Sequence, residues 1–380
     1  CDMLIENDTG RAAKVIEITT GLKTTYPGIE AMPNYGFLVY NRMRGAYNLA
    51  TGAEGEQAAQ GLAILEETWK EIKTFPDFKY LANACKMGAN AHNNLAKGLE
   101  ERAKKTADAA AKAELEKQAE AERSRALEFY LDLLDAAPNQ TLSTYRYVLY
   151  QLDKRPREPK SADYRKIIEL APKALSMFGK DEASAAELAQ VRILLASAHC
   201  RLNNWRDAIP ILEETDAPFE QEFQKRLKAY EAAKARYDAE PDRHPQPKYP
   251  SRQLLQIQVR EWLGRAYLET NAKSKLKDAQ LFYADQVRMY PKPDHVKHWE
   301  GLYYLCESTR MMGDYEEVQK YLFKASLVIG QNPVTTGKGS PQDFQTLAAK
   351  LRKEIEALPD AARRKALLPT MDLIDKNLSK

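Results

Sequence analysis

The chain is 380 residues long, which allows either two or three compact domains or one elongated array. It is 44% hydrophobic and 29% charged, with little glycine and much Ala, Leu, Lys and Glu, a composition that favours helices. The 57 basic and 54 acidic residues leave a net charge of +3, so overall charge gives no attraction to nucleic acid or an anionic membrane. No run approaches the roughly 18 consecutive apolar residues of a membrane-spanning helix.

The first residue is a cysteine, Cys1. A bacterial lipoprotein matures to an N-terminal cysteine that carries its lipid, and a fragment boundary explains the same residue equally well. The other cysteines, Cys85, Cys200 and Cys306, lie in apolar helical patterns, where a free cysteine packs as a small hydrophobic residue. None of the four forms a CxxC pair, so neither a zinc ribbon nor a haem attachment site is predicted.

The first predicted helix spans 12–26 and is closed by Pro27. It has the pattern of the second helix of a hairpin whose first helix is missing, which predicts that the sequence begins inside a larger array. No alternating strand pattern bounded by turn residues follows anywhere in the chain. The sequence therefore predicts an all-α protein.

A degenerate hairpin follows, with one helix around 87–91 and another over 126–138, whose pattern comprises Ala126, Tyr130, Leu133 and Pro138. The stretch 97–125 between these helices is rich in alanine and nearly balanced in charge, so it is a good intrinsic helix former with many possible ion pairs between successive turns. It predicts that both helices extend into a projecting hairpin. Such an arm is either a solvated extension or a contact arm for a neighbouring protein.

The clearest internal repeat begins at Leu263. The run 263–267 reads LGRAY, and Ala279, Tyr283 and Pro291 follow it. A small residue at this place lets two helices approach closely, and the aromatic residue fills the gap beside it. The pattern indicates a pair of antiparallel helices closed by a proline.

Two further copies of this pattern flank the first. One spans 302–325 and has Gly313 in its turn, and the other spans 195–212 and has Asn203 and Asn204 there. Glycine, or asparagine in a left-handed conformation, lets the chain reverse after a helix. Three copies with the same order of small, turn and aromatic residues predict a solenoid of stacked hairpins.

These copies resemble the tetratricopeptide repeat family. The resemblance implies an α-solenoid, in which antiparallel helix pairs stack into a right-handed superhelix. Each hairpin must stack on its neighbours because it cannot bury its apolar face alone. The resemblance also implies a concave groove that holds a peptide or a helix of a partner protein.

The domain organisation is predicted from these patterns. Residues 1–340 form the helical repeat array, and two helices within 341–380 cap it, since terminal repeats need a polar outer face. The proline-rich stretches 154–160 and 240–252 are expected to connect hairpins.

Motifs that would indicate chemistry are weak. His295 and His298 share a helix face near Glu300, but a zinc site needs three or four ligands and the sequence offers no further one. The run 335–340 reads TTGKGS and fails the phosphate-loop pattern GxxxxGK[ST]. No nucleophile elbow, HExxH motif or dinucleotide fingerprint is present. We therefore expect no cofactor, no metal and no catalysis.

The resemblance places the groove on first-helix positions that point away from the core of each helix pair. This set mixes both charges with one aromatic residue, and it comprises Ser197, Arg201, Glu261, Arg265, Tyr303, Glu307 and Arg310. The basic clamp by which some family members hold a C-terminal carboxylate is not matched. The expected ligand is an extended peptide or a partner helix, and the alternative is that these residues are solvated while partners use the convex face or the arm.

The leading expectation is a non-catalytic scaffold that binds other proteins and no nucleic acid. The first alternative is a lipid-anchored structural subunit of a larger bacterial assembly, located in the periplasm or at the cell surface if Cys1 is lipidated. Without that lipid the protein is expected in the cytoplasm. The second alternative is an enzyme whose active site is built from scattered residues of a helical scaffold.

Overall fold

A computed structural model describes residues 9–75, 77–155, 160–179, 181–335 and 338–379, so the lipidation predicted at Cys1 lies outside the described residues. Within these ranges the chain forms 15 α-helices and four single-turn 3₁₀ helices, and no β-strand. The predicted all-α class is therefore confirmed. The chain divides into two compact units, residues 1–160 and 161–380. The division falls at the end of the predicted proline-rich connector 154–160.

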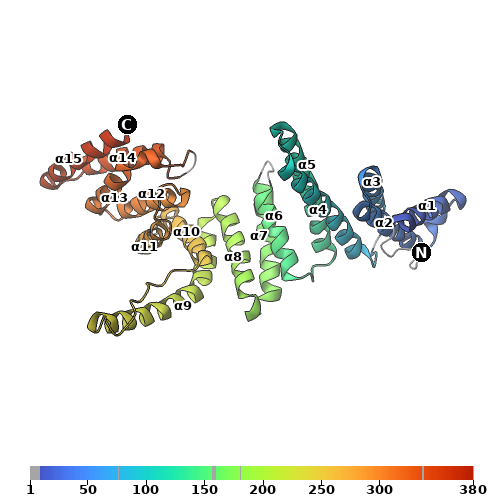
Figure 1. Ribbon diagram of the computed structural model, residues 1–380, viewed down its shortest axis with the longest axis horizontal. Helices are drawn as coiled ribbons and strands as arrows, with labels where there is room; N and C mark the ends of the chain where they lie inside the picture. Colours follow the sequence, from blue (N-terminus) through green and yellow to red (C-terminus); the bar gives the residue numbers. More distant parts are fainter. Residues whose placement is uncertain (1–8, 76, 156–159, 180, 336–337, 380) are drawn as a thin grey trace. The chain divides into compact units, whose positions relative to one another are not determined.

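The described residues of unit 1 form six α-helices, which follow one another in chain order (Figure 1). They are α1 Thr9–Thr25, α2 Tyr35–Gly52, α3 Gly55–Ile72, α4 Leu81–Lys105, α5 Ala109–Ala136 and α6 Leu142–Lys154. A 3₁₀ turn, Ile29–Ala31, precedes α2. Helices α4 and α5 pair closely and form the predicted elongated hairpin, whose tip lies between Lys105 and Ala109.

Unit 2 contains nine α-helices within the described residues. They are α7 Ser161–Phe178, α8 Ala185–Arg201, α9 Trp205–Ala239, α10 Leu254–Glu269, α11 Leu276–Met289, α12 Val296–Met311, α13 Tyr315–Leu327, α14 Pro341–Glu356 and α15 Ala361–Leu378. Three 3₁₀ turns lie between them, at Glu182–Ser184, Lys273–Lys275 and Ile329–Gln331.

The helices of unit 2 pack in the manner of a solenoid. Each helix from α7 to α13 packs against the next one, and α14 packs against α15. In addition α8 packs against α10, α12 against α14 and α13 against α15. The contacts α8–α10 and α12–α14 join first helices of successive pairs, and the contact α13–α15 joins second helices. The apolar core therefore continues between these hairpins.

The turns between the helices of these pairs share one backbone feature. Asn203 follows α8, Asn271 follows α10 and Gly313 follows α12, and these residues have φ values of 62°, 49° and 77°. Asparagine and glycine tolerate this left-handed conformation, and it turns the chain sharply at the end of a helix. The predicted role of the Asn203 and Gly313 turns is confirmed, and Asn271 repeats it in the middle pair.

A glycine and an aromatic residue set the spacing within two hairpins. A Cβ atom on Gly264 would lie 2.9 Å from the ring of Tyr283, so only glycine admits this ring, as the LGRAY pattern predicts. In unit 1 a Cβ atom on Gly88 would lie 2.2 Å from the ring of Phe129. The sequence pattern had placed Tyr130 in that role, but the ring of Tyr130 packs on Tyr147 of α6 instead.

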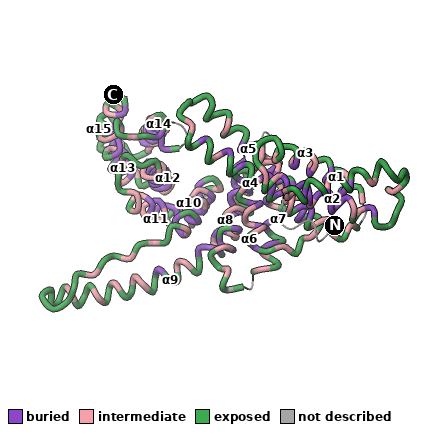
Figure 2. Tube along the Cα trace, turned by 45° about the vertical axis from the view of Figure 1, so that its right-hand side comes forward, coloured by how far each residue is buried: buried purple, intermediate pink, exposed green. Residues whose placement is uncertain are grey.

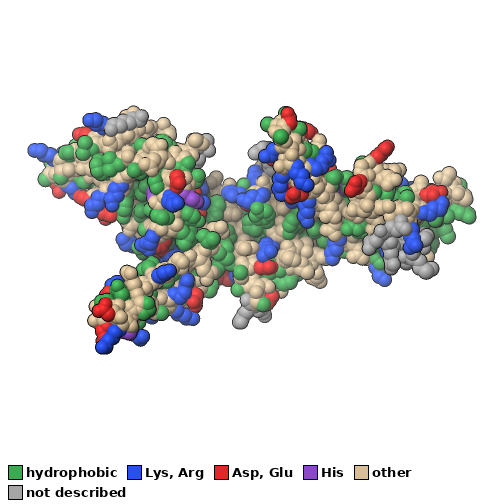
Figure 3. Space-filling view, in the orientation of Figure 1, with side chains coloured by type: hydrophobic (Ala, Val, Ile, Leu, Met, Phe, Trp, Pro, Cys, Tyr) green, Lys and Arg blue, Asp and Glu red, His purple; other side chains and the backbone are tan. Residues whose placement is uncertain are grey.

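Helix α9 is longer than the repeat pattern predicts. Its first part carries the predicted core residues Ala208 and Leu212, both fully buried, but the helix continues to Ala239. Beyond Phe223 the helix is largely exposed (Figure 2), and on its visible side acidic and basic side chains are interspersed (Figure 3). The proline-rich segment 240–253 has no regular secondary structure and returns along α9, where the ring of Tyr249 packs on that of Tyr230.

The two helices predicted in 341–380 are present as α14 and α15. Helix α14 begins with a capping box, in which Ser340 accepts from the backbone N–H of Asp343 and the Asp343 carboxylate accepts from the backbone N–H of Ser340. This arrangement satisfies two backbone N–H groups at the helix start. The apolar faces of α14 and α15 pack with α12 and α13 in one core, which includes Phe344 and Met371.

Candidate functional site

The seven predicted groove positions lie on three helices of unit 2. Ser197 and Arg201 belong to α8, Glu261 and Arg265 to α10, and the remaining three to α12. Helix α8 packs against α10, and Lys297 of α12 bonds Glu261 of α10, so these three first helices are linked in chain order. Of the seven residues, Arg201 and Arg265 lie in a cluster around Trp262, and Glu307 and Arg310 lie in a second cluster against α14.

Arginine and aromatic side chains alternate in the cluster around Trp262. The guanidinium carbon of Arg201 lies 5.2 Å from the ring centre of Tyr164 and 5.7 Å from that of Trp262. The guanidinium carbon of Arg265 lies 5.9 Å from the Trp262 ring and 5.2 Å from the Trp205 ring. Each contact of this kind contributes about 0.5–1 kcal/mol when exposed and more when water is excluded. We call these five residues the arginine–tryptophan cluster.

Arg265 differs from the other charged residues of the predicted groove. Its Nε atom is buried and has no hydrogen-bond partner in the described part of the chain. Its ion pair with Glu269 is long, at 4.0 Å, and 36% of its side chain remains exposed. Two indole rings hold the guanidinium group of Arg265, which has five N–H donors. The buried Nε donor is closed to a ligand, so only donors in the exposed part of the side chain can meet an acceptor from outside the chain.

The other position on α10, Glu261, is engaged within the protein. Its carboxylate accepts a hydrogen bond of 2.6 Å from Nζ of Lys297, which also bonds Glu300 at 2.8 Å. Burial and the nearby Glu300 raise the pKa of Glu261, although Lys297 opposes this shift. Glu261 therefore links α10 to α12 through Lys297, and its carboxylate is not a free acceptor.

The cluster against α14 is an internal ion network. Arg310 is buried, and it donates to Glu307 at 2.7 and 2.8 Å and to Glu354 of α14. Lys350 adds a bond of 3.1 Å to Glu307. Burial disfavours the Glu307 carboxylate, but Arg310 and Lys350 outweigh this effect and hold its pKa below the ordinary value. These residues join α12 to α14.

The two uncharged positions are also packed within the protein. Ser197 is buried and donates to the backbone carbonyl of Leu194 at 3.0 Å. Tyr303 is half-buried, with its ring 6.0 Å from that of Phe344 and with Nζ of Lys338 at 5.3 Å from its centre. Of the seven positions, Arg265 thus offers the clearest unused hydrogen-bonding capacity.

Sequence reasoning identified Arg201 and Arg265 but missed the two indole rings that hold Arg265. A signal was present for Trp262, since it lies three residues before Arg265 and side chains at this spacing share a helix face. Trp205 begins the next helix, and only the chain reversal at Asn203 brings its ring to Arg265.

A second cluster of ionisable side chains lies in the core of unit 1. His92 on α4 is 3% exposed, and its Nδ1 and Nε2 atoms lie 2.6 Å from Glu122 of α5 and 2.8 Å from Glu66 of α3. Arg125 bonds both oxygens of Glu66 at 2.5 Å. With both ring nitrogens occupied and the ring buried, this histidine joins three helices and has no nitrogen available to a substrate.

The protonation of this histidine cluster follows from its hydrogen bonds. A neutral imidazole carries one N–H, and two carboxylate partners require two. Burial opposes the charged ring, but Glu122 and Glu66 outweigh it and raise the pKa of His92. Burial likewise opposes ionisation of Glu66, and the bonds from Arg125 and His92 lower its pKa to about 2. The imidazolium form of His92 is therefore the one that can donate to both carboxylates.

The remaining candidates for chemistry have structural partners. His295 accepts from the backbone N–H of Lys297 at the start of α12, and Nδ1 of His298 lies 2.7 Å from the carbonyl of Tyr290. A search of the described ranges finds no group of three His, Cys, Asp or Glu residues that could hold a metal ion. None of the helices described is both long and apolar enough to cross a membrane.

Comparison with known proteins adds no assignment. Neither a protein-family model nor a curated protein sequence matches this chain. The tetratricopeptide resemblance therefore depends on the residues of the three hairpin copies.

Proposed function

We propose that this protein is a non-catalytic scaffold that binds partner proteins along the first helices of unit 2. The observation that carries the proposal is Arg265, a guanidinium group that is positioned by two indole rings and keeps 36% of its side chain exposed. The solenoid packing supports it, because stacked hairpins present successive first helices as one extended surface. The resemblance to tetratricopeptide repeats agrees with this use of the fold.

The arginine–tryptophan cluster defines what a partner segment must supply. An acceptor oxygen, from a carboxylate or a backbone carbonyl, would bond the donors of Arg265. An apolar or planar group would lie against the exposed parts of the rings of Trp205 and Trp262, both of which are partly buried. Arginine and tryptophan are enriched among residues that dominate the binding energy of protein interfaces. We therefore assign Arg265 and Trp262 as the centre of the proposed binding surface.

The test is affinity purification of the full-length protein from its native source, with mass spectrometry of bound proteins. The proposal predicts stoichiometric partners whose recovery falls at least tenfold with Arg265→Glu, because the charge is reversed at the centre of the surface. The matched control is Arg236→Glu, which is expected to retain the partners. Arg236 is exposed and lies in the part of α9 beyond Phe223, which we call the projecting part. The proposal fails if Arg265→Glu retains the same partners, or if the wild-type protein is recovered alone after cross-linking.

A further inference from the structure

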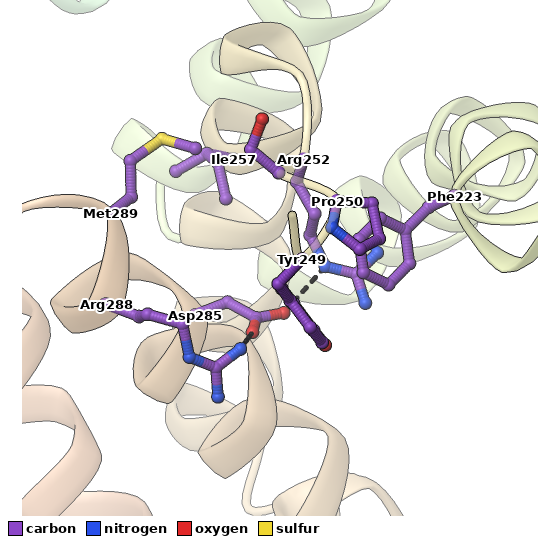
Figure 4. A pocket seen from close by; sticks show the side chains of 9 residues that line it. Phe223, Tyr249, Pro250, Arg252, Ile257, Asp285, Arg288 and Met289 are labelled. Atoms are coloured by element: carbon purple, nitrogen blue, oxygen red, sulfur yellow. Dashed lines mark hydrogen bonds and ion pairs between the residues drawn. The ribbon is translucent and has the colours of Figure 1, made fainter. Parts of the chain in front are cut away.

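A small cavity lies at the base of the projecting part of α9, apart from the arginine–tryptophan cluster (Figure 4). Its volume is about 210 Å³. We call it the α9 pocket. Three helices and the returning segment of unit 2 line it, through Phe223 of α9, Tyr249 to Arg252 of the segment, Ile257 of α10, and Asp285, Arg288 and Met289 of α11.

The size of the α9 pocket indicates what it holds. Pockets for drug-sized ligands measure about 300–1,000 Å³, whereas an apolar cavity of about 150 Å³ is enough to bind benzene. A volume of about 210 Å³ therefore fits one aromatic or branched aliphatic side chain. Phe223, Ile257 and Met289 supply apolar walls for such a group.

The walls of the pocket are fixed before any ligand enters. Phe223 is 3% exposed, and the guanidinium carbon of Arg252 lies 3.7 Å from its ring centre. Arg252 also donates to Asp285 at 2.6 Å and to Glu220 of α9. These contacts tie α9, the returning segment and α11 together at the pocket.

A second buried arginine also holds α9 against α10 beside the pocket. Arg260 of α10 is 5% exposed, donates twice to Asp216 of α9 at 2.9 Å, and also bonds Glu220. A preformed site avoids the cost of ordering side chains when a ligand binds. The packing of α9 on α10 therefore keeps the pocket in shape.

Exposed apolar side chains lie on the pocket wall and on the helices that line the pocket. Tyr249, on its wall, is 50% exposed. Leu254 is 64% exposed and precedes Ile257 by three residues, and Leu281 is 52% exposed and precedes Asp285 by four. Side chains at these spacings share a helix face, so both leucines lie on the faces that carry pocket residues. Exposed apolar surface around a preformed pocket is typical of a protein interaction site.

The charges at the pocket are arranged with the cation outward. Arg288 donates to Asp285 at 2.9 Å, but 62% of its side chain is exposed against 18% for Asp285. Figure 4 shows Arg288 and Asp285 side by side on α11. Lys248, just before the wall residue Tyr249, is exposed as well. A ligand at the mouth therefore meets positive charge, which favours an acidic neighbour of the apolar group.

We propose that the α9 pocket is a second protein-binding site, which takes one bulky apolar side chain of a partner that carries Asp or Glu beside it. The pocket volume selects the single side chain, the exposed leucines extend the contact, and Arg288 pairs with the acidic residue. The projecting part of α9 and its returning segment thus build a site at their base. This proposal does not depend on the arginine–tryptophan cluster.

The test uses three defined probes on the full chain: N-acetyl-phenylalaninamide, N-acetyl-aspartyl-phenylalaninamide and the matched asparaginyl compound. Ligand-observed NMR is expected to show saturable binding of all three, with the aspartyl probe about threefold tighter than the asparaginyl one, as for an exposed ion pair. Arg288→Gln removes that difference, and Arg265→Glu leaves it unchanged.

The decisive variant is Ser251→Trp, which places an indole in the pocket from an exposed wall position. We expect it to weaken binding of all three probes at least tenfold while the thermal unfolding temperature is kept. The proposal is overturned if no probe binds saturably, if Ser251→Trp binds them as the wild type does, or if Arg288→Gln keeps the preference for aspartate. Arg288 is mostly exposed, so its variant tests the site even if Ser251→Trp does not fold.

Discussion

The histidine of unit 1 makes the stability of that unit depend on pH in a specific direction. His92 bonds Glu122 and Glu66 through both ring nitrogens, which raises its pKa in the folded protein above the ordinary value near 6.5. A group with a raised folded pKa binds more protons in the folded state. Its contribution is fully present below about pH 6.5 and is lost as pH rises through the folded pKa.

The perturbation is His92→Gln, which keeps a polar side chain but removes the cation. Breaking a buried ion pair by removing one partner costs about 3–5 kcal/mol, because the other charge stays buried. Glu66 and Glu122 each keep 24% of their side chains exposed, and Glu66 retains Arg125, so we expect the lower end, about 3 kcal/mol. A loss of this size increases the population of the locally open state by about 100-fold.

The assay is amide hydrogen exchange with mass spectrometry, which measures opening of α3, α4 and α5 separately from unit 2. After correction for intrinsic exchange, wild-type protection of these helices falls as pH rises above about 6.5, while that of His92→Gln starts lower and stays flat. Helix α15, which contains no histidine, is the control in the same sample. The reasoning is refuted if the variant loses protection with pH as steeply as the wild type.

Three further outcomes test other contacts of the fold. Gly88→Ala pushes a methyl group into the ring of Phe129 and should destabilise unit 1 by about 2 kcal/mol in urea unfolding, whereas Gly98→Ala, with open space around it, should not destabilise it. Arg260→Met removes the arginine that pairs with Asp216 in the core and leaves it only the bond from Gln256, with an expected cost of about 3 kcal/mol; an unchanged urea midpoint would contradict this. On acidification, the free energy of unfolding decreases as pH falls from 4.5 towards 2, because the pKa of Glu66 is lowered to about 2 in the folded protein. The loss is at most about 3 kcal/mol, and it is smaller because a quarter of the Glu66 side chain is exposed. The variant Glu66→Gln removes this step in an acid titration.

The elongated features of the two units show that a repeat array can carry different kinds of projection. Helices α4 and α5 extend together and cover each other's apolar faces. The outer part of α9 has only a proline-rich segment without regular secondary structure beside it. The α9 pocket lies where this segment meets α9, α10 and α11.

The sequence by itself determined the helical class and much of the hairpin order. Ala, Leu, Lys and Glu in helical patterns specify helices locally, and asparagine or glycine after a helix specifies the reversal. Gly264 and Tyr283 could be paired from the LGRAY run and the aromatic residue that follows it. The elongation of 97–125 was also readable, since it depends on intrinsic helix propensity.

Tertiary structure decided which side chains meet across helices. The pattern selected Tyr130 where the packing uses Phe129, since neighbouring positions on one helix differ only in the partner that they face. Residue type alone could not tell which charged positions of the proposed groove form internal ion pairs and which remain available to a partner. Arg310 and Arg265 are the same residue on equivalent helices, but Glu307 and Glu354 engage the first, whereas indole rings hold the second. Whether an arginine is satisfied depends on residues distant in sequence, so only the folded chain reveals it.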